Sequence, residues 1–213
     1  MKEIERKTTI EIKGIAFPNK GAELLLAAIL QEINDEYKVC LEPHGDYRNK
    51  IKYPIYTKAC LRFLGFNVIF FLSMLPVVLR KKLGLINESE VDVVLDASGF
   101  AYGDEWSAGI ARDRVLKDRA PKIFLPQSFG EFKLKKSRDV IKKIGRDALL
   151  IYSREERGRR DIKSVTGIDP KVVRDITFGY KVVKSPIERD LIIIPNFQVY
   201  KREGDGYIKK ILK

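Results

Sequence analysis

Four short segments of the sequence combine glycine with hydroxyl, amide, carboxylate or guanidinium side chains. They are residues 19–23 (NKGAE), 96–106 (DASGFAYGDEW), 126–130 (PQSFG) and 153–156 (SREE). Glycine lets a ligand approach the backbone, free amides at the start of a helix attract anions, and a guanidinium can bind an anion through two parallel hydrogen bonds. The second segment adds aromatic faces and carboxylates, which together are suited to holding a carbohydrate.

Ten side chains or glycines of these segments are the candidate ligand-binding residues. They are Asn19, Gly21, Glu23, Ser98, Gly99, Tyr102, Asp104, Gln127, Ser128 and Arg154. Structural roles are open beside the binding roles: Asn19 and Asp104 suit helix caps, and Arg154 suits an ion pair with acids of its own helix. The glycine spacings of dinucleotide sites and of phosphate loops are missing. The sequence predicts no metal site and no cofactor, and it identifies no catalytic residue.

Short apolar runs that alternate with helix-length segments must position these residues. Strands are expected at residues 8–15, 37–41, 92–96, 122–126, 148–152, 171–174 and 190–194, and helices at 22–33, within 106–119 and at 154–165. Nearly continuous apolar strands are typical of a parallel sheet covered on both faces. The predicted fold is therefore α/β, with a doubly wound, Rossmann-like and mostly parallel sheet. Ligands of such sheets bind beyond the carboxyl ends of the strands, so the four segments should meet along one rim.

Composition and charge limit the class of protein. The 213 residues are 45% hydrophobic, which suffices for one large domain and excludes a disordered chain. Two cysteines, Cys40 and Cys60, exclude a disulfide framework, and the charged start does not resemble a signal peptide, so a cytoplasmic location is expected. The net charge is +12, and residues 131–163 hold 12 Lys and Arg against 6 Asp and Glu. This stretch is either an anion-binding stripe or the solvated faces of helices; nucleic-acid binding is not expected, because its motifs are missing.

Residues 63–79 form an uncharged, mostly apolar stretch between Arg62 and three basic residues at 80–82. As a single helix the stretch would span about 26 Å, less than the ~30 Å of a hydrocarbon core. We expect a helix in the core or at a domain interface. The second interpretation is peripheral contact of residues 63–82 with the inner face of a membrane, and the third is a membrane span.

Taken together and in this order, the segments resemble the polysaccharide pyruvyl transferase family. Five motifs carry the resemblance, at residues 19–23, 96–104, 126–130, 153–155 and 175–178 (DITF), and it covers about residues 8–198. The resemblance implies a transferase of exopolysaccharide biosynthesis. Such an enzyme moves the pyruvyl group of phosphoenolpyruvate to two hydroxyls of a sugar in a cell-surface polysaccharide or its lipid-linked precursor, and phosphate is released.

The resemblance also implies a division of labour between two domains of a GT-B fold. The acceptor sugar lies against the N-terminal domain, and phosphoenolpyruvate is held by basic residues and a histidine of the C-terminal domain. Residues 1–198 would be the Rossmann-like acceptor-side domain, and residues 199–213 the start of a linker or helix toward the other domain. The single histidine, His44, is not where the catalytic histidine of the family would lie.

We therefore expect a truncated chain that lacks the donor-binding half and is inactive alone. Two alternatives stay open. The chain is either a non-catalytic carbohydrate-binding α/β module or half of a GT-B glycosyltransferase that uses a nucleotide sugar.

Overall fold

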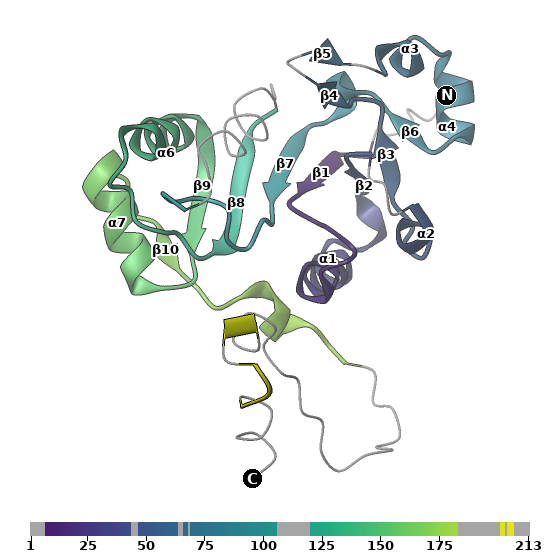
Figure 1. Cartoon of the computed structure of the whole chain (residues 1–213). Coiled ribbons are helices and arrows are strands. Elements are labelled where there is room, and N and C mark those ends of the chain that lie inside the picture. The colour runs from purple at the N-terminus through teal and green to yellow at the C-terminus, as the bar shows by residue number, and fades with distance from the viewer. Residues whose placement is uncertain are drawn as a thin grey trace. The chain divides into compact units, whose positions relative to one another are not determined.

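The computed structural model describes residues 7–43, 47–63, 66–67, 69–105, 120–182, 201–202 and 204–206. The chain divides into two compact units, Met1–Lys181 and Val182–Lys213. Every helix and strand named below belongs to the first unit (Figure 1). The strand expected at 190–194 and the helix expected within 106–119 lie outside the described residues, as does His44.

Eight parallel strands form one sheet in the order β10-β9-β8-β7-β1-β2-β3-β6. In chain order they are β1 (Thr9–Lys13), β2 (Lys38–Leu41), β3 (Tyr56–Lys58), β6 (Leu85–Ile86), β7 (Val93–Asp96), β8 (Lys122–Gln127), β9 (Ala148–Ser153) and β10 (Lys171–Val172). A separate antiparallel pair consists of β4 (Arg62–Phe63) and β5 (Phe66–Asn67). The predicted α/β class and parallel sheet are confirmed, since all pairings described within the eight-stranded sheet are parallel.

Helices connect most of these strands. They are α1 (Lys20–Ile33), α2 (Tyr47–Lys50), α3 (Phe70–Ser73), α4 (Val77–Lys82), α6 (Lys135–Asp147) and α7 (Glu156–Thr166), with 3-10 turns η1 (Asn34–Glu36), η2 (Glu88–Glu90) and η3 (Ile176–Gly179). The longer helices α1, α6 and α7 carry the apolar side chains that form the core on the sheet.

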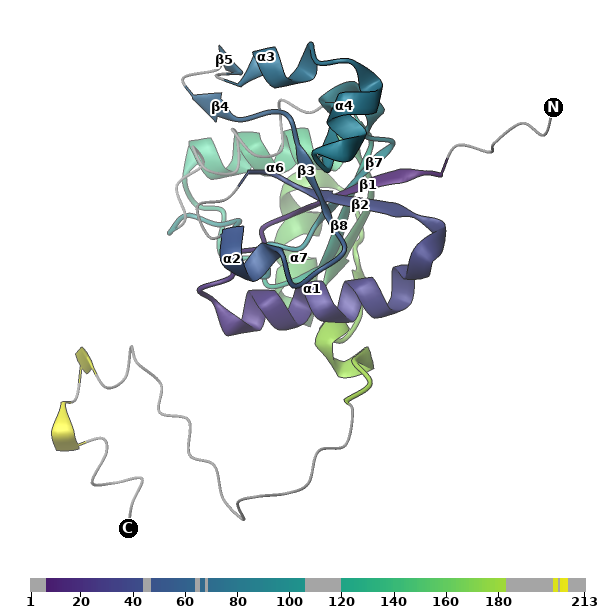
Figure 2. The same ribbon diagram turned by 90° about the vertical axis from the view of Figure 1, so that its right-hand side faces the viewer.

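Helices cover both faces of the sheet. Leu26 of α1 belongs to one apolar cluster, whereas Ile141 of α6 and Ile162 of α7 belong to another. Phe124 and Leu125 are neighbours in β8, so their side chains point to opposite faces. Phe124 lies in the cluster of α6 and α7, and Leu125 packs against the cluster of α1. Helix α1 therefore lies on one face and α6 and α7 lie on the other, as Figures 1 and 2 show.

The direction of winding reverses between β1 and β7. From β1 the chain builds outward to β2, β3 and β6, and from β7 it builds the other way to β8, β9 and β10. At this place the turns after the two strands touch, because a Cβ on Gly14 would lie 2.3 Å from the Cα of Ser98. Gly14 also has a φ of +84°, which other residues rarely adopt. Open parallel sheets bind their ligands at the carboxyl ends of strands at such a reversal.

The prediction of one helix over residues 63–79, in the core or at a domain interface, is wrong. The described part of this stretch is divided among β4, β5, α3 and α4. Pro76 separates the two helices because it has no N–H to donate. Phe70, Met74 and Val78 are 58%, 72% and 68% exposed, so this apolar stretch lies on the surface. Within the described part of the chain, no helix combines the length and the apolar character that a membrane span requires.

The basic stretch 131–163 contributes the outer surfaces of α6 and α7. Side chains such as Lys135, Lys142 and Arg160 are exposed there, while Ile141 and Ile144 face the core. The stretch is therefore a pair of amphipathic helices whose charges face solvent, which matches the structural interpretation of the sequence.

Candidate functional site

The turns after β7, β8 and β9 are joined by hydrogen bonds around Arg154. Its guanidinium donates to the Gly99 carbonyl oxygen at 2.6 Å and to Ser128 Oγ at 3.2 Å. The Ser128 N–H donates to the same Gly99 oxygen at 2.9 Å, and the Arg154 N–H donates to the Gln127 carbonyl at 3.1 Å. The second, third and fourth segments of the sequence analysis thus form one surface at the carboxyl edge of the sheet.

The charge of Arg154 is balanced inside the protein. Its guanidinium forms an ion pair with Asp175, the residue that precedes η3. Burial opposes ionisation of Asp175, but hydrogen bonds from Thr177 and the contact with Arg154 outweigh it, so the pKa of this carboxyl is lowered. Arg154 therefore holds turns together, and its partner is Asp175 rather than an acid of its own helix.

Three buried polar groups at this edge lack hydrogen-bond partners among the described residues. They are the side-chain amide of Gln127, the hydroxyl of Ser98 and Nε of Arg154. Gln127 is fully buried at the end of β8. Buried polar atoms without partners cost free energy unless water or a ligand satisfies them. Such groups are tolerated where a fold reserves polar atoms for a bound molecule, and all three lie on the turns joined by Arg154.

A pocket of about 570 Å³ opens between these turns. It is lined by Phe100, by Ser128 and by four carboxylates, those of Asp104, Glu105, Glu131 and Glu155. Arg157 is the one basic residue in the described lining, and it is already paired with Glu131 at 2.6 Å. A slightly larger hollow of about 630 Å³ lies between α6 and α7, but none of the ten candidate residues lines it. The pocket at the strand ends is therefore the candidate site.

Ser128 and Glu155 form the boundary between this pocket and the Arg154 cluster. The Ser128 hydroxyl donates to Glu155 Oε1 at 2.6 Å while it accepts from Arg154. Phe100 is 38% exposed, so part of its ring is available to stack on a ligand. An exposed aromatic face beside carboxylate acceptors can bind the apolar face and the hydroxyls of a sugar ring.

Asp104 lines the pocket but also supports the fold. Its carboxylate accepts hydrogen bonds from the Ser137 hydroxyl and from the N–H groups of Lys133, at 2.7 Å, and Leu134, at 3.1 Å. The bond from Ser137, followed by the backbone bonds, lowers the pKa of Asp104. Lys133 and Leu134 directly precede α6 and Ser137 lies in its first turn, so Asp104 fixes the chain at the start of that helix from a distant turn.

Tyr102 and Glu23 also have structural partners. Tyr102 is 2% exposed, donates to Asp96 Oδ2 at 2.6 Å and packs against Phe124, which makes it a core residue. Glu23 accepts from Lys20 at 2.6 Å and from the Tyr53 hydroxyl at 3.0 Å. The bond from Lys20, followed by that from Tyr53, lowers the pKa of Glu23.

The first segment caps α1. Asn19 Oδ1 accepts from the N–H groups of Gly21, at 3.0 Å, and Ala22, at 3.4 Å. Among the described residues no hydrogen bond was found between this segment and the Arg154 cluster. The chain that leads from β1 to this segment touches the rim, where Gly14 lies against the backbone of Ser98.

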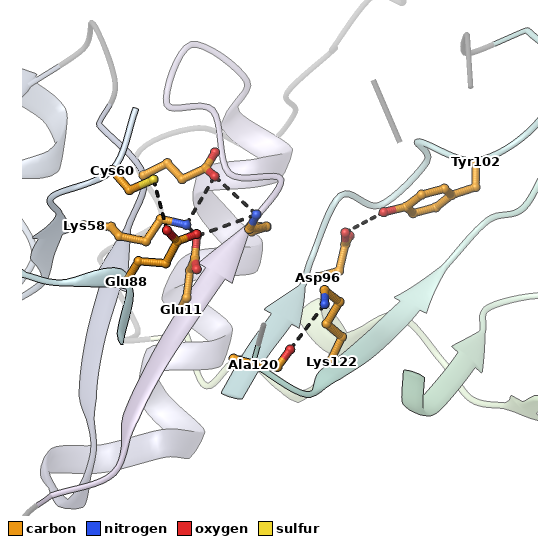
Figure 3. A network of polar contacts seen from close by, with 10 residues as sticks. Glu11, Lys58, Cys60, Glu88, Asp96, Tyr102, Ala120 and Lys122 are labelled. Atoms are coloured by element: carbon orange, nitrogen blue, oxygen red, sulfur yellow. Dashed lines mark hydrogen bonds and ion pairs between the residues drawn. The ribbon is translucent and has the colours of Figure 1, made fainter. Parts of the chain in front are cut away.

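A row of charges lies at the same edge, on the face opposite α1, and Glu11, Lys13 and Lys58 in it are buried whereas Glu42 is partly exposed (Figure 3). Lys58 contacts Glu11 at 2.6 Å and Glu42 at 3.5 Å, and Lys13 contacts Glu42 at 3.2 Å. Lys13 is also the register partner of Asp96 in β7. Across β7, β1, β2 and β3 the charges therefore alternate in sign at the strand ends, which lets each compensate its neighbours.

Glu155 and Asp175 were expected only as members of motifs and not as site residues, and the row of charges was not predicted. The alternation in Ile10, Glu11, Ile12 and Lys13 reads as one buried and one solvated face, yet Glu11 and Lys13 are 1% and 4% exposed. A signal was present for Asp175, which lies in the last of the five motifs, but its partner Arg154 is 21 residues away.

Comparison with known proteins adds one finding to this geometry. Neither the comparison with curated proteins nor that with solved structures gave a match. A family model described as polysaccharide pyruvyl transferase matches residues 19–212, a range that begins at Asn19 and contains all ten candidate residues. The chain therefore belongs to the polysaccharide pyruvyl transferase family.

Proposed function

We propose that this chain binds the saccharide acceptor in a pyruvyl transfer from phosphoenolpyruvate. The acceptor is a sugar residue of a cell-surface polysaccharide or of its lipid-linked precursor. In this proposal residues 1–198 act as the acceptor-side domain, of the doubly wound kind found in the N-terminal half of a GT-B fold, and residues 199–213 begin the connection to the donor side.

The observation that carries the proposal is the charge of the pocket at the strand ends. Four carboxylates line it, and its one described basic residue, Arg157, is already paired. Phosphoenolpyruvate carries a phosphate and a carboxylate, and such a lining would repel it. A sugar is uncharged and offers many hydroxyl donors, which carboxylates accept. The site thus supports the acceptor role rather than the donor role.

The proposed reaction makes a ketal. Both hydroxyl oxygens of the acceptor bond to C2 of phosphoenolpyruvate, and its CH2 carbon takes up one hydroxyl proton to become a methyl group. The bond from C2 to the phosphate oxygen breaks, and the phosphate leaves with the second proton. Carboxylates that hold the two hydroxyls orient them for attack and lower the entropic cost of bringing them together.

Calorimetry with a panel of glucose-, galactose- and mannose-containing oligosaccharides tests the acceptor role. We expect at least one of them to bind, and we expect Phe100→Leu to weaken that binding at least about tenfold by removing the stacking face. The matched control is Phe70→Leu, because Phe70 is similarly exposed, at 58%, but lies on α3 outside the pocket lining.

Two outcomes would contradict the proposal. One is tight binding of phosphoenolpyruvate that Phe100→Leu abolishes, which would assign the pocket to the donor. The other is binding of a nucleotide sugar at the same pocket, which would favour a glycosyltransferase.

A further inference from the structure

Helices α3 and α4 and the residue after α4 expose seven large apolar side chains. These are Phe70, Phe71, Met74, Val77, Val78, Leu79 and Leu83, with exposed fractions from 42% to 72%. We name this set the α3–α4 surface. Both views place α3 and α4 together at the β6 end of the sheet, on the opposite side of the molecule from α1 (Figures 1 and 2). Contiguous apolar surface of this kind marks an interaction site.

The exposure of the α3–α4 surface is built into the fold. An ordinary surface helix buries its apolar side chains and exposes its charged ones, but α4 does the reverse. Its buried residue is Arg80, at 7% exposure, whereas Val77, Val78 and Leu79 are exposed. The Arg80 guanidinium donates to the carbonyls of Ser73, at 3.1 Å, and Leu75, at 2.9 Å.

A second layer of contacts fixes Arg80 to the body of the molecule. Its guanidinium also pairs with Glu90 Oε2 at 2.9 Å, and the same carboxylate oxygen accepts from the Asn87 N–H at 2.8 Å. The Asn87 side chain donates to the Ser73 carbonyl at 3.1 Å. These bonds fix the turn between α3 and α4 to the body of the molecule. Helix α4 would have to break them in order to rotate its apolar side chains toward the core.

Basic residues predominate in the part of the sequence that contains the α3–α4 surface. Between Tyr47 and Asn87 the sequence has eight Lys and Arg and no Asp or Glu. Lys81 and Lys82 follow the apolar side chains of α4 directly and are exposed. Of the acids that follow in the sequence, Glu90 is already paired with Arg80. An apolar face bordered by exposed lysines is complementary to a surface that is apolar inside and negatively charged outside.

We propose that the α3–α4 surface docks the protein onto an anionic lipid bilayer, with the apolar side chains in the interfacial region and Lys81 and Lys82 on lipid phosphates. A second copy of the chain fits this surface less well. A two-fold contact brings the same patch of each copy together, and the basic residues of the two copies would then repel each other. The inference stands independently of the saccharide site.

Co-sedimentation of the full chain with vesicles tests this docking. We expect binding to vesicles that contain phosphatidylglycerol, and at least tenfold weaker binding to pure phosphatidylcholine. Raising the salt from about 0.1 M to about 0.5 M should weaken the binding, because charges near the surface are then screened. Met74→Ser/Val78→Ser and Lys81→Glu/Lys82→Glu should each reduce binding to the anionic vesicles at least tenfold.

Two matched variants serve as controls. Leu149→Ser removes an apolar side chain that is 60% exposed on β9, and Lys135→Glu/Lys136→Glu makes the same charge reversal on α6. Both should bind the anionic vesicles as the unchanged protein does. All variants should melt within a few degrees of the unchanged protein, since the altered side chains are exposed.

Three results would overturn the inference. The first is equal affinity of the unchanged protein for both kinds of vesicle. The second is loss of binding in the α6 variant but not in the α4 variant, which would transfer the lipid contact to the basic faces of α6 and α7. The third is a dimer in solution that Met74→Ser/Val78→Ser converts to a monomer without any change in vesicle binding.

Discussion

Arg154 shows how one side chain can organise a site that it does not line. Its guanidinium reaches the Gly99 carbonyl, the Ser128 hydroxyl and Asp175, which come from three different turns. A planar group with several fixed donors can serve three acceptors at once. The pocket lies next to these turns, so its shape depends on a residue whose charge is already neutralised.

Arg154→Lys is expected to disturb both stability and binding. A single ammonium cannot satisfy three acceptors in different directions, so partly buried oxygen atoms lose their donors. We expect the free energy of unfolding to fall by about 1–3 kcal/mol. Saccharide binding should weaken at least tenfold. Urea denaturation and calorimetry measure the two effects.

Arg160→Lys is the control for this substitution. Arg160 lies on α7, and its side chain is exposed and forms no hydrogen bond within the described part of the chain. Both measurements should be unchanged in this variant. Equal losses in the two variants would mean that Arg154 does not organise the turns.

Asp104 gives a prediction that depends on pH. Because its pKa in the folded protein is lowered, the carboxylate stabilises the fold at pH values above its pKa in the unfolded chain, about 4. This stabilisation is lost as the pH falls through the folded-state pKa. Asp104→Ala should therefore lower the melting temperature by a few degrees near neutral pH, and the difference from the unchanged protein should shrink toward about pH 3.

Asp104→Asn separates capping from charge. Asparagine can still accept hydrogen bonds at the start of α6, so this variant should melt between Asp104→Ala and the unchanged protein. A difference in melting temperature that grows as the pH falls would contradict the assignment of the cap to the ionised carboxylate.

At the scale of elements, prediction succeeded where hydrophobicity was continuous. Strands β2, β7, β8 and β9 and helix α1 lie where apolar runs predicted them, and β1 lies where a β-branched segment did. Strand β3 was missed because it has three residues and ends at Lys58, and β6 because it has only two. Their place in the sheet is set by neighbouring strands, which a local pattern does not reveal.

The candidate site was predictable only in part for a related reason. A turn after a buried strand predicts a position at the carboxyl edge, which brought Gly99, Ser128 and Arg154 together as expected. The partners of Asp104 and Tyr102 are set by packing between distant elements. The sequence around Asp104 suggests a cap for the residues that follow it, whereas in the structure its carboxylate binds the residues at the start of α6, about 30 residues later.

The charges at the ends of β1, β2 and β3 should stabilise the fold only as long as each keeps its partner of opposite sign. Lys58 and Glu11 are both 1% exposed and 2.6 Å apart. Lys58→Met leaves Glu11 buried without its nearest cation, so we expect a loss of about 3–5 kcal/mol in the free energy of unfolding. Adding Glu11→Gln to this variant should restore part of the loss, and urea denaturation of the four proteins gives the coupling energy.

A surface ion pair provides the comparison. Lys133 and Glu131 are 2.5 Å apart, but both are exposed to solvent. Lys133→Met should leave the denaturation midpoint unchanged, because solvent already screens the pair. A similar loss in both variants would show that burial of Lys58 is not what makes its charge important.

At the scale of the whole molecule, the proposed saccharide site and the proposed lipid-binding surface lie at different places on the sheet. The carboxyl edge near β7, β8 and β9 carries the pocket proposed for the saccharide, and the α3–α4 surface lies at the β6 end. A transferase that acts on lipid-linked sugars needs both a saccharide site and a way to reach the membrane. The two proposals are compatible, and each can fail without the other.

The last prediction concerns where the folded domain ends. The described core residues all precede residue 177. The turn η3 packs on α1 a few residues before the first unit ends at Lys181. Gln31 of α1 exchanges two hydrogen bonds with the backbone of Lys181, at 2.9 and 3.1 Å, which fixes the end of the first unit. A chain shortened to end at Lys181 should therefore unfold cooperatively, with a melting temperature within a few degrees of the unchanged protein.

A second chain, ended at residue 198, makes this test decisive. The sequence predicts a strand at 190–194 within a domain of 198 residues, and a strand that paired with the sheet would add backbone hydrogen bonds and apolar burial. If that strand contributes, the longer chain will melt well above the shorter one, and the boundary belongs near 198. Equal melting temperatures, together with equal oligosaccharide binding, would place the boundary near 181, because the sheet, both apolar clusters and the pocket then need nothing beyond it.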